Sequence, residues 1–324
     1  MRVLVTGGFG FSGTALVHRL TEAGHTVIVL TRRPRWDLVQ ERVVERALFG
    51  DVRDEKAVRT AMYGVDAVCH FAALTRVRDS FERPDEYRDV NVDGTRTVLA
   101  AAVAEGKRRG RPLVFLQAST AAVYGAPELQ PIAETAPPAP SSPYGRTKLE
   151  ADELVLQAAT AGSVSGVVLR AFNVCGAVDG VGDSDLTRII PKAIAVAAGE
   201  APELGVNRDG TAIRDFVHVD DVARAYVLAL DAAEPGRPQI YNVGATGASV
   251  ADIIDAVQRL TGRNMTVIHN PPQPEPPTVL ADSSLIRQRL GWSPERSSLD
   301  EIVRDAWAAA AASSGRRAAG SPRG

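Results

Sequence analysis

Tyr144 and Lys148 are the two residues whose types and spacing most strongly suggest chemistry. Residues four positions apart on a helix share one face, so the lysine ammonium can act on the tyrosine phenol. A tyrosine pKa of about 10 makes a poor base at neutral pH, and a neighbouring cation favours the phenolate. The same spacing is also common on solvated helices. Because a hydroxyl at Thr120 and a glycine-rich N-terminal segment accompany the pair, we interpret Tyr144 as a catalytic base.

The glycine-rich segment runs from Thr6 to Gly13 as Thr-Gly-Gly-Phe-Gly-Phe-Ser-Gly. It follows a strand-like run and opens a helical one, which is the context of a dinucleotide-binding loop. Glycines there allow a tight turn and a close approach of the backbone, and the helix N-terminus faces the pyrophosphate. A glycine-rich connection without a ligand is the weaker alternative. The expected cofactor contacts in this loop are Gly7, Gly10, Phe11 and Gly13.

The residues expected near the adenosine leave the choice between NAD and NADP open. NAD sites usually carry an acid at the end of the second strand, and this chain has Thr31, Arg32 and Arg33 there. Arginines attract the 2′-phosphate that a carboxylate would repel, so NADP is an alternative to NAD. Solvated loop charges explain the two arginines about equally well. Asp51 and Val52, after the next strand-like segment, are candidates for contact with the adenine.

The first two-thirds of the chain alternates short β-branched runs with amphipathic helical stretches, which predicts βαβ units on a parallel sheet. The predicted strands are Val3–Thr6, Thr26–Leu30, Ala67–Phe71, Leu113–Ala118 and Gly166–Arg170, and the predicted helices are Thr14–Ala23, Glu55–Met62, Tyr87–Glu105 and Tyr144–Ala159. Beyond Asn173 we expect a loop at 176–185, helices at 186–199, 220–231 and 250–261, and an extended segment at 211–219. The fold class is therefore α/β, a Rossmann-type doubly wound parallel sheet with a smaller C-terminal lobe.

The composition excludes several classes of protein. With 324 residues, 45% hydrophobic content and a net charge of −2, the chain gives no reason to expect nucleic-acid or membrane partners. Its two cysteines, Cys69 and Cys175, are too few for a disulfide framework, which favours a reducing cytoplasm. The N-terminus runs directly into a strand, so we expect no signal peptide. The Ala-, Gly-, Arg- and Ser-rich stretch at 313–324 is expected to be a disordered tail.

An ordered series of motifs carries a resemblance to a known family. The motifs are Thr6–Gly13, His70–Ala73, Asn91–Thr95, Ser119–Gly125, Ser142–Lys148, Leu169–Gly176 and Arg214–Asp221. Over roughly residues 1 to 310 the chain resembles the extended short-chain dehydrogenase/reductases, and among them the UDP-glucose 4-epimerase-type enzymes of the NAD-dependent epimerase/dehydratase family. The resemblance implies a dinucleotide-binding domain at 1–171 plus about 213–244. It implies a nucleotide-sugar-binding lobe at about 172–212 plus 245–312.

The resemblance also implies roles for individual residues. A bound nicotinamide would take hydride from a sugar carbon while Tyr144 takes the hydroxyl proton, with Thr120 bonded to the same oxygen and Lys148 on the nicotinamide ribose. The keto-sugar would then rotate and receive hydride on its other face. Further cofactor contacts would be Phe71, Ala72, Ala73 and Asn91, and substrate contacts would be Phe172, Asn173, Asp185, Leu186 and Arg214. Purely structural roles remain alternatives for Thr120 as a turn cap, for Asn91 as a buried amide and for Asn173 as a loop contact.

Several positions bear on the reaction and the substrate. Family members that dehydrate nucleotide sugars have Asp and Glu after the threonine, and Ala121 and Ala122 cannot transfer a proton, so dehydration is disfavoured. An arginine usual in the family is missing from the stretch Pro272–Glu275. Asp185 stands where an asparagine is usual, and Val279 falls near a position at which a small residue would admit an N-acetyl group.

The predicted function is that of a nucleotide-sugar 4-epimerase. It would act on substrates of the UDP-glucose/UDP-galactose type, with N-acetylated and other sugars left open. The first alternative is an NAD(P)-dependent reductase or dehydrogenase of a keto-sugar or another small carbonyl compound. A non-catalytic dinucleotide sensor is disfavoured because Thr120, Tyr144 and Lys148 are all present. The resemblance further implies a homodimer, formed through the helices predicted at Tyr87–Glu105 and Tyr144–Ala159.

Overall fold

The computed structural model describes residues 1–33, 35–41, 43–271 and 276–319, which fall into two compact units. Unit 1 contains Met1–Ala171, Val222–Val243 and Asp282–Trp292, and unit 2 contains Phe172–Asp221, Gly244–Ala281 and the chain from Ser293 onward. Residues 213–221, which the sequence analysis assigns to the dinucleotide-binding domain, lie in unit 2, and residues 282–292 lie in unit 1. Three separate segments of the chain therefore build unit 1.

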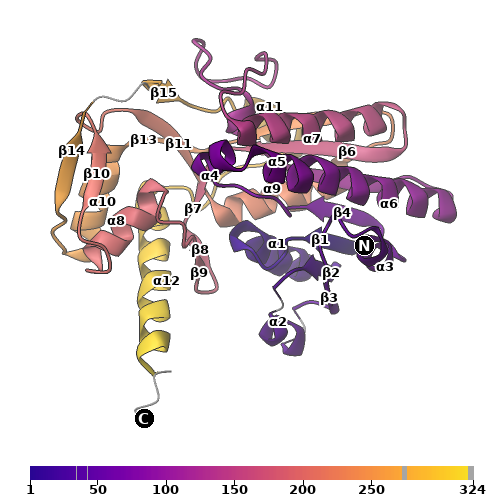
Figure 1. Cartoon of the computed structure of the whole chain (residues 1–324), viewed down its shortest axis with the longest axis horizontal. Coiled ribbons are helices and arrows are strands. Elements are labelled where there is room, and N and C mark those ends of the chain that lie inside the picture. The colour runs from indigo at the N-terminus through magenta and orange to yellow at the C-terminus, as the bar shows by residue number, and fades with distance from the viewer. Residues whose placement is uncertain (34, 42, 272–275, 320–324) are drawn as a thin grey trace. The chain divides into compact units, whose positions relative to one another are not determined.

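Unit 1 is built on a seven-stranded sheet in which neighbouring strands are parallel (Figure 1). The strand order is β12-β6-β5-β4-β1-β2-β3, which confirms the predicted Rossmann-type sheet. The strands are β1 (Arg2–Thr6), β2 (Thr26–Thr31), β3 (Arg46–Phe49), β4 (Ala67–His70), β5 (Leu113–Thr120), β6 (Val164–Ala171) and β12 (Gln239–Val243). The sequence pattern gives no bounds for the edge strands β3 and β12. The side chains of β3 are only partly buried, and β12 contains the polar residues Gln239 and Asn242, so neither strand is a continuous apolar run.

The helices of unit 1 differ from the prediction chiefly at Tyr87–Glu105. The single helix predicted there is wrong, because the structure has two helices and a turn between them. The helices are α1 (Phe11–Glu22), α2 (Trp36–Gln40), α3 (Glu55–Met62), α4 (Val77–Glu82), α5 (Pro84–Arg88), α6 (Gly94–Arg109), α7 (Pro143–Thr160), α11 (Ser284–Leu290) and most of α9 (Val219–Ala232), with a 3₁₀ turn η2 (Ala121–Val123). A π-helical turn, η1 (Asp89–Asp93), joins α5 to α6. Pro84 starts α5, because proline suits the first helical turn. A π turn is frequent at functional sites, and this one carries Asn91.

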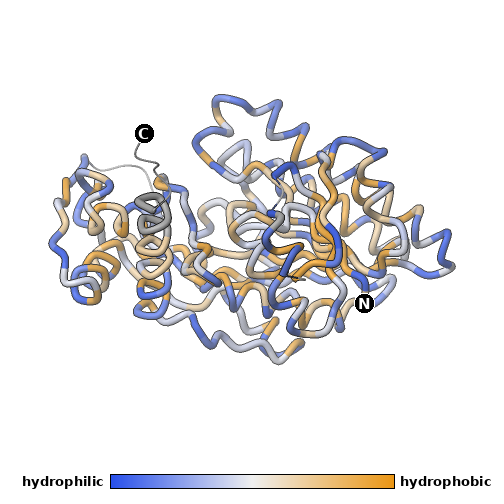
Figure 2. The backbone as a smooth tube through the Cα atoms, turned by 90° about the horizontal axis from the view of Figure 1, so that it is seen from below, coloured by the Kyte–Doolittle hydropathy of each residue, from blue (hydrophilic) through white to orange (hydrophobic). Residues whose placement is uncertain are grey.

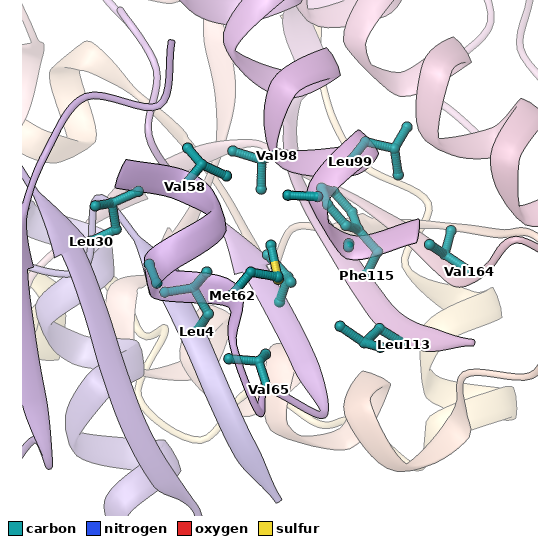
Figure 3. Close-up of a cluster of buried hydrophobic side chains, with 14 of the residues drawn as sticks. Leu4, Leu30, Val58, Met62, Val65, Val98, Leu99, Leu113, Phe115 and Val164 are labelled. Carbon is teal, nitrogen blue, oxygen red and sulfur yellow. The ribbon is translucent and has the colours of Figure 1, made fainter. Parts of the chain in front are cut away.

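One face of the sheet packs against α3, α6 and α7 through a buried aliphatic cluster (Figure 3). There Leu4 and Leu30 from the strands meet Val58 and Met62 of α3. Burying each such side chain contributes roughly 1.5–3 kcal/mol. Val29, next to Leu30, points to the opposite face, which α1 covers. The strands beside the N-terminus are accordingly hydrophobic along their length (Figure 2). This two-sided burial fixes the strand ends from which the candidate site residues project.

Unit 2 combines small sheets with the helices α8 (Ile189–Ala197), α10 (Val250–Thr261) and α12 (Leu299–Ala319). Its strands are β7 (Asn173–Cys175), β8 (Ala177–Val178), β9 (Val181–Gly182), β10 (Leu204–Asn207), β11 (Ile213–His218), β13 (Thr246–Ser249), β14 (Val267–Asn270) and β15 (Thr278–Val279). β11 is parallel to β7 and β15 and antiparallel to β13. Ile190, Phe216, Ile253 and Ile302 belong to the buried cluster that joins the three helices to this sheet.

The C-terminal end of unit 2 departs from the expected disordered tail. α12 continues to Ala319, through residues 313–319. The alanines at 308–312 give it a high intrinsic helix propensity, which explains the difference. Residues 320–324 and the stretch Pro272–Glu275 lie outside the described residues. Within the described part of the chain, no helix combines the length and apolar character needed to cross a membrane.

Candidate active site

The glycine loop between β1 and α1 has the geometry that a dinucleotide loop requires. α1 begins at Phe11, earlier than predicted, with Gly10 at its N-cap and no side-chain cap. A Cβ on Gly13 would lie 2.3 Å from the Gly7 oxygen, and a Cβ on Gly7, whose φ is +69°, would lie 2.9 Å from the Ala72 nitrogen. Only glycine fits these two positions. The first turn of α1 also lacks acidic residues, so its uncapped amides suit a pyrophosphate.

A buried chain of hydrogen bonds joins the end of β1 to the π turn through His70. His70 Nδ1 lies 2.7 Å from Thr6 Oγ1, and His70 Nε2 lies 3.0 Å from Thr95 Oγ1. The Thr95 hydroxyl donates its one proton to the Asn91 carbonyl at 2.6 Å, so it accepts from His70 Nε2–H. Burial, together with the charge of Lys148, lowers the pKa of His70 to about 3. The imidazole is therefore neutral, and its Nδ1 accepts from Thr6.

Asn91 links the π turn to two other segments. Its Oδ1 accepts from the Leu74 amide at 2.8 Å, and its Nδ2 donates to the Leu74 carbonyl at 3.0 Å and to Thr147 Oγ1 at 3.1 Å. The Thr147 hydroxyl donates to the Tyr144 carbonyl at 2.9 Å. Asn91, which is 1% exposed, thus ties the loop after β4 to the first turn of α7. Its direct contact with a cofactor stays a prediction.

The start of α7 brings Tyr144 to the turn that follows Thr120. Ser142 caps the helix by accepting from the Gly145 amide at 3.1 Å. A Cβ on Gly145 would lie 2.6 Å from the Ala122 oxygen, so glycine is what permits this close approach. Thr120 Oγ1 accepts from the Ala122 amide at 3.2 Å, and its hydroxyl proton can still be donated elsewhere. Capping the turn is therefore compatible with a role in chemistry.

Tyr144 and Lys148 are both buried, with exposures of 9% and 4%. The ring of Tyr87 meets the Tyr144 ring edge-on, with centroids 6.4 Å apart and planes at 85°. Burial lowers the pKa of Lys148 to about 8, while the charge of Asp152 opposes that shift. At pH 7 the ammonium form dominates, so a fixed cation lies on the same helix face as the phenol.

The predicted cofactor contacts after β4 lie against the glycine loop. The Ala72 amide donates to Thr6 Oγ1 at 3.2 Å. The Phe71 ring packs on the Tyr226 ring, with 4.6 Å between centroids. Phe71, Ala72 and Ala73 are all half-buried, so part of each remains accessible to a ligand. Their packing fits a group bound along this edge of the sheet, and their contact with the nicotinamide stays a prediction.

The residues predicted near the adenosine lie at the ends of β2 and β3. Thr31 Oγ1 accepts from the Arg33 amide and donates to the Arg33 carbonyl, both at 3.0 Å, so its hydroxyl closes a local turn. Arg32 lies 3.9 Å from the Asp51 carboxylate and is 59% exposed. Hydrogen bonds from Arg53 lower the pKa of Asp51. Val52, the last predicted residue of this group, is buried.

Apart from Thr120 and Tyr144, which lie in unit 1, the predicted substrate residues belong to unit 2. Phe172 is buried at 7% exposure, and the Asn173 side-chain amide on β7 donates to the Asp215 carbonyl at 2.7 Å. Arg214 on β11 is half-buried, donates to the Ile213 carbonyl at 2.9 Å, and is the register partner of Val279 on β15. Asn173, Arg214 and Val279 therefore share one sheet of this unit.

Asp185 and Leu186 precede α8. The Asp185 carboxylate accepts from the Thr187 amide at 3.0 Å and from the Thr187 hydroxyl at 2.7 Å, which closes a local turn. Leu186 is exposed. The carboxylate at position 185 thus has a structural partner, and its contact with a nucleotide stays a prediction.

Two buried polar residues of unit 1, His70 and Asp152, are not among the individual site residues that the sequence predicts. His70 belongs to the motif His70–Ala73, and its place at the end of a buried strand is the sequence signal that indicates it. Asp152 lies one turn after Lys148 on α7 and is fully buried. The sequence signal for Asp152 is its spacing of four residues from the predicted catalytic Lys148 on one helix.

Comparison with known proteins places these features in a family. Residues 3–244 match the NAD dependent epimerase/dehydratase family. UDP-glucose 4-epimerase of Corynebacterium glutamicum is 36% identical over 318 residues, covering 95% of each chain, and that of Streptomyces lividans is 38% identical over 320 residues, covering 94% of this chain and 95% of the other. The crystal structure of UDP-glucose-4-epimerase from Stenotrophomonas maltophila, with bound NAD and formylated UDP-arabinopyranose, has a TM-score of 0.88 at 33% identity, covering 98% and 99% of the two chains.

Proposed function

The chain belongs to the NAD-dependent epimerase/dehydratase family, and on this basis we propose that it is a nucleotide-sugar 4-epimerase of the UDP-glucose type. One observation carries the proposal: α7 presents Tyr144 and Lys148 beside the Thr120 turn, in a chain that matches known UDP-glucose 4-epimerases over nearly its whole length. UDP-glucose and UDP-galactose are the proposed substrates, and N-acetylated and other nucleotide sugars are further candidates.

NAD is the proposed cofactor. Its support is the NAD bound in the relative from Stenotrophomonas maltophila and the fit of the glycine loop to a pyrophosphate. The proposed contacts are Gly7, Gly10, Phe11 and Gly13 for the pyrophosphate, Thr31, Arg32, Asp51 and Val52 for the adenosine, and Phe71, Ala72, Ala73 and Asn91 at the nicotinamide end. When bound, the nicotinamide supplies a hydride acceptor and donor.

Three side chains of unit 1 would manage the proton. Tyr144 takes the proton of the sugar C4 hydroxyl and returns it after the sugar ring has turned. Thr120 donates its hydroxyl proton to the same oxygen, since its acceptor bond to Ala122 leaves that proton available. Lys148 favours the phenolate through its charge and binds the nicotinamide ribose. Acid–base catalysis of this kind typically contributes about 10²–10⁴-fold in rate.

Ala121 and Ala122 limit the reaction. They form the 3₁₀ turn after Thr120, at the place where an acid and a base would be needed for loss of water. Methyl side chains exchange no protons, so a dehydratase route along this turn has no groups to serve it. Epimerisation needs one hydroxyl to be deprotonated and reprotonated. Tyr144 can transfer this proton while Thr120 bonds to the same oxygen.

The substrate would be recognised by residues of unit 2. Phe172 offers an apolar surface, and Arg214 offers a charge-assisted donor for the diphosphate. Asn173, Asp185 and Leu186 complete the proposed set. The small side chain at Val279, beside Arg214 in the β11–β15 register, supports acceptance of a substituent larger than hydroxyl at sugar C2.

A direct test is interconversion of UDP-glucose and UDP-galactose by the purified chain without added cofactor, followed by NMR of the sugar anomeric protons. Mass analysis of the small molecules released on denaturation identifies the bound nucleotide. We expect redox-neutral interconversion and release of NAD. Failure to interconvert any UDP-, dTDP- or GDP-sugar, with or without added NAD, would overturn the proposal.

An NADP-dependent reductase or dehydrogenase of a keto-sugar or small carbonyl compound is the second candidate. It is favoured by one observation, the exposed Arg32 at the end of β2 where an acid is usual. A stoichiometric change in nicotinamide absorbance with a candidate substrate supports this reading. Strict redox neutrality removes it.

Two further properties complete the proposal. We propose a homodimer formed through α5, α6 and α7, with support from the resemblance and from the exposed, partly apolar α7 surface at Glu153, Leu156 and Gln157. Light scattering that gives the mass of one chain would contradict it. A cytoplasmic location is supported by Cys69 and Cys175, which are free and buried in the structure. Cell fractionation tests the location.

A further inference from the structure

A buried ionic cluster centred on Asp152 lies next to the proposed catalytic lysine along α7. Asp152 is 0% exposed and lies one turn after Lys148 on α7. Its Oδ2 accepts from Ser119 Oγ on β5 at 2.7 Å and from Arg170 Nε on β6 at 3.2 Å. Its Oδ1 is buried and has no hydrogen-bond partner among the described residues. Ser119 and Arg170 therefore fix the carboxylate through one of its two oxygens.

Arg170 is held at its other end as well. Its Nη1 donates to the Tyr124 hydroxyl at 3.0 Å, and that hydroxyl donates to Asn242 Oδ1 at 2.8 Å. The Asn242 side-chain amide in turn donates to the Ile132 carbonyl at 2.8 Å. Arg170 is 3% exposed, so its charge is fixed in place by these contacts. It cannot move away from Asp152 without leaving several buried polar groups unpaired.

The titratable groups that interact with Asp152 come from three elements of unit 1: Lys148 on the same helix, Arg170 on β6 and the Tyr226 phenol on α9. The neutral His70 on β4 interacts with Lys148. Burial raises the pKa of the Asp152 carboxyl, and the charges of Arg170 and Lys148, with the Ser119 hydroxyl, oppose the rise. Burial also raises the pKa of Tyr226, which stays neutral. Asp152 is thus the carboxylate whose charge acts on both Lys148 and Arg170.

We propose that Asp152 is a positioning residue that acts through Lys148: its carboxylate, fixed by Ser119 and Arg170 one helical turn from the buried lysine, keeps the lysine charged. This inference rests on the proposed function for its catalytic meaning, because only a tyrosine–lysine mechanism needs that cation. The electrostatic part concerns the folded chain alone. It can be measured whether or not the enzyme turns over a nucleotide sugar.

The direction of the effect follows from the sign of the charge. Burial has already lowered the pKa of Lys148 to about 8, and the carboxylate of Asp152 opposes that lowering. Removing the carboxylate charge therefore lowers the pKa of Lys148 further, so the ammonium is lost at a lower pH. For a buried opposite charge one helical turn away, the expected shift is about 1 pH unit.

The test is a pH titration of the protein labelled with ¹³C at the lysine ε-carbons. The other lysines are Lys56, Lys107 and Lys192, and Lys148→Arg identifies the remaining signal. We expect the Lys148 signal to titrate near pH 8 in the wild type and about 1 unit lower in Asp152→Asn. Asp152→Glu should restore most of the shift. The matched control Glu153→Gln removes an exposed carboxylate from the next position of α7 and should leave the titration unchanged.

A second variant separates the charge effect from damage to the fold. Asp152→Asn leaves Arg170 buried without its partner, which is strongly destabilising. Asp152→Asn combined with Arg170→Gln removes both charges and should recover part of the lost unfolding free energy. The lowered Lys148 titration should persist in that double variant. A folded single or double variant whose Lys148 titrates as in the wild type overturns the proposal.

The dependence of kcat on pH tests whether Asp152 matters for catalysis. In folded Asp152→Asn we expect kcat to fall about fivefold at pH 8 and less than twofold at pH 6.5, as a pKa lowered by about 1 unit requires. A loss that is the same at both pH values indicates a merely structural role and also overturns the proposal. Absence of epimerase activity in the wild type would instead reject the proposed function and leave the lysine titration interpretable.

Discussion

The buried polar residues beside the proposed catalytic groups of unit 1 and two of the proposed substrate residues of unit 2 are held by different kinds of contact. In unit 1, His70 and Asn91 are buried and make side-chain hydrogen bonds to residues far away in the sequence, such as Thr6 and Thr147. In unit 2, the Asp185 carboxylate bonds to Thr187, two positions away, and Arg214 bonds to the adjacent carbonyl. The bonds described for His70 and Asn91 are thus buried and long-range, and those described for Asp185 and Arg214 are local. Asn173, which bonds to the Asp215 carbonyl 42 positions away, is an exception among the substrate residues.

This difference explains where the chain departs from its family. A buried polar network is costly to disturb, because each group left unpaired loses about 1–3 kcal/mol. Residues with local partners can change without such a cost. The departures at Asp185 and Val279 lie in unit 2, and the departure at Arg32 and Arg33 lies at exposed residues of unit 1. Thr120, Tyr144 and Lys148 in unit 1 keep the pattern of the family. We therefore expect packing to fix the residues proposed for the chemistry, and the choice of sugar to depend on side chains that can vary.

The largest expected effect tests whether unit 1 carries the chemistry. Tyr144→Phe removes the phenol oxygen and keeps the ring that packs edge-on against Tyr87. We expect kcat to fall by about 10³-fold, with an unchanged unfolding midpoint and unchanged NAD content. Turnover by NMR, denaturant unfolding and mass analysis of released nucleotide measure the three quantities. Activity within tenfold of the wild type would move the proton transfer to another group.

The second effect concerns the stability of the buried network in unit 1. The pKa of His70 is about 3 in the folded chain and near 6.5 when unfolded, so the unfolded state alone takes up a proton below about pH 6.5. Stability from this site is therefore full above pH 6.5 and is lost as pH falls, by roughly 2 kcal/mol at pH 5.

Urea unfolding at pH 7.5 and pH 5 measures that loss, and His70→Gln should reduce it. The exposed His269 of unit 2 provides the matched control, because His269→Gln should keep the wild-type dependence on pH. Equal loss of stability in His70→Gln and in the wild type would show that the imidazole is not held neutral.

The same contrast decides how much of the molecule the sequence predicts. Short-range patterns are enough for β1, β2 and β4, which are short runs buried along most of their length. They are also enough for the predicted bounds of α10, which a Ser249–Asp252 capping box starts. Gly13 and Gly145 follow from motifs, and the structure gives their physical reason in close backbone approaches.

The contacts that fix unit 1 depend on residues that meet only after folding. Thr6 and His70 are 64 positions apart, and Asn91 and Thr147 are 56 positions apart. No periodicity in a single segment reports such pairs, and the π turn at Asp89–Asp93 also has no propensity signal that distinguishes it from an α-helix. The pairing of His70 with Thr6 and Thr95 therefore has no local signal in the sequence. Asp152 shares one helix with Tyr144 and Lys148, but its hydrogen-bond partners Ser119 and Arg170 lie on other elements.

A third effect tests the role assigned to unit 2. Arg214→Gln keeps a hydrogen-bond donor and removes the charge, so we expect KM for the UDP-sugar to rise about tenfold while kcat changes less than twofold. Initial-rate kinetics separate the two constants. Arg263→Gln, an exposed arginine of the same unit, should change neither. A fall in kcat with unchanged KM would mean that Arg214 belongs with the chemistry, and the contrast between the units would fail.

The smallest effect concerns Arg32, the exposed charge of unit 1 that lies outside its buried network. Its ion pair with Asp51 is 3.9 Å long and largely solvated, so Arg32→Ala should change the unfolding free energy by less than about 0.5 kcal/mol. Because NAD has no 2′-phosphate, the same variant should release as much NAD as the wild type, and Arg33→Ala should match it. Release of NADP from the wild type, lost in Arg32→Ala, would instead make this surface arginine a determinant of cofactor choice. It would also show that local contacts select the ligand in unit 1 as they are proposed to do in unit 2.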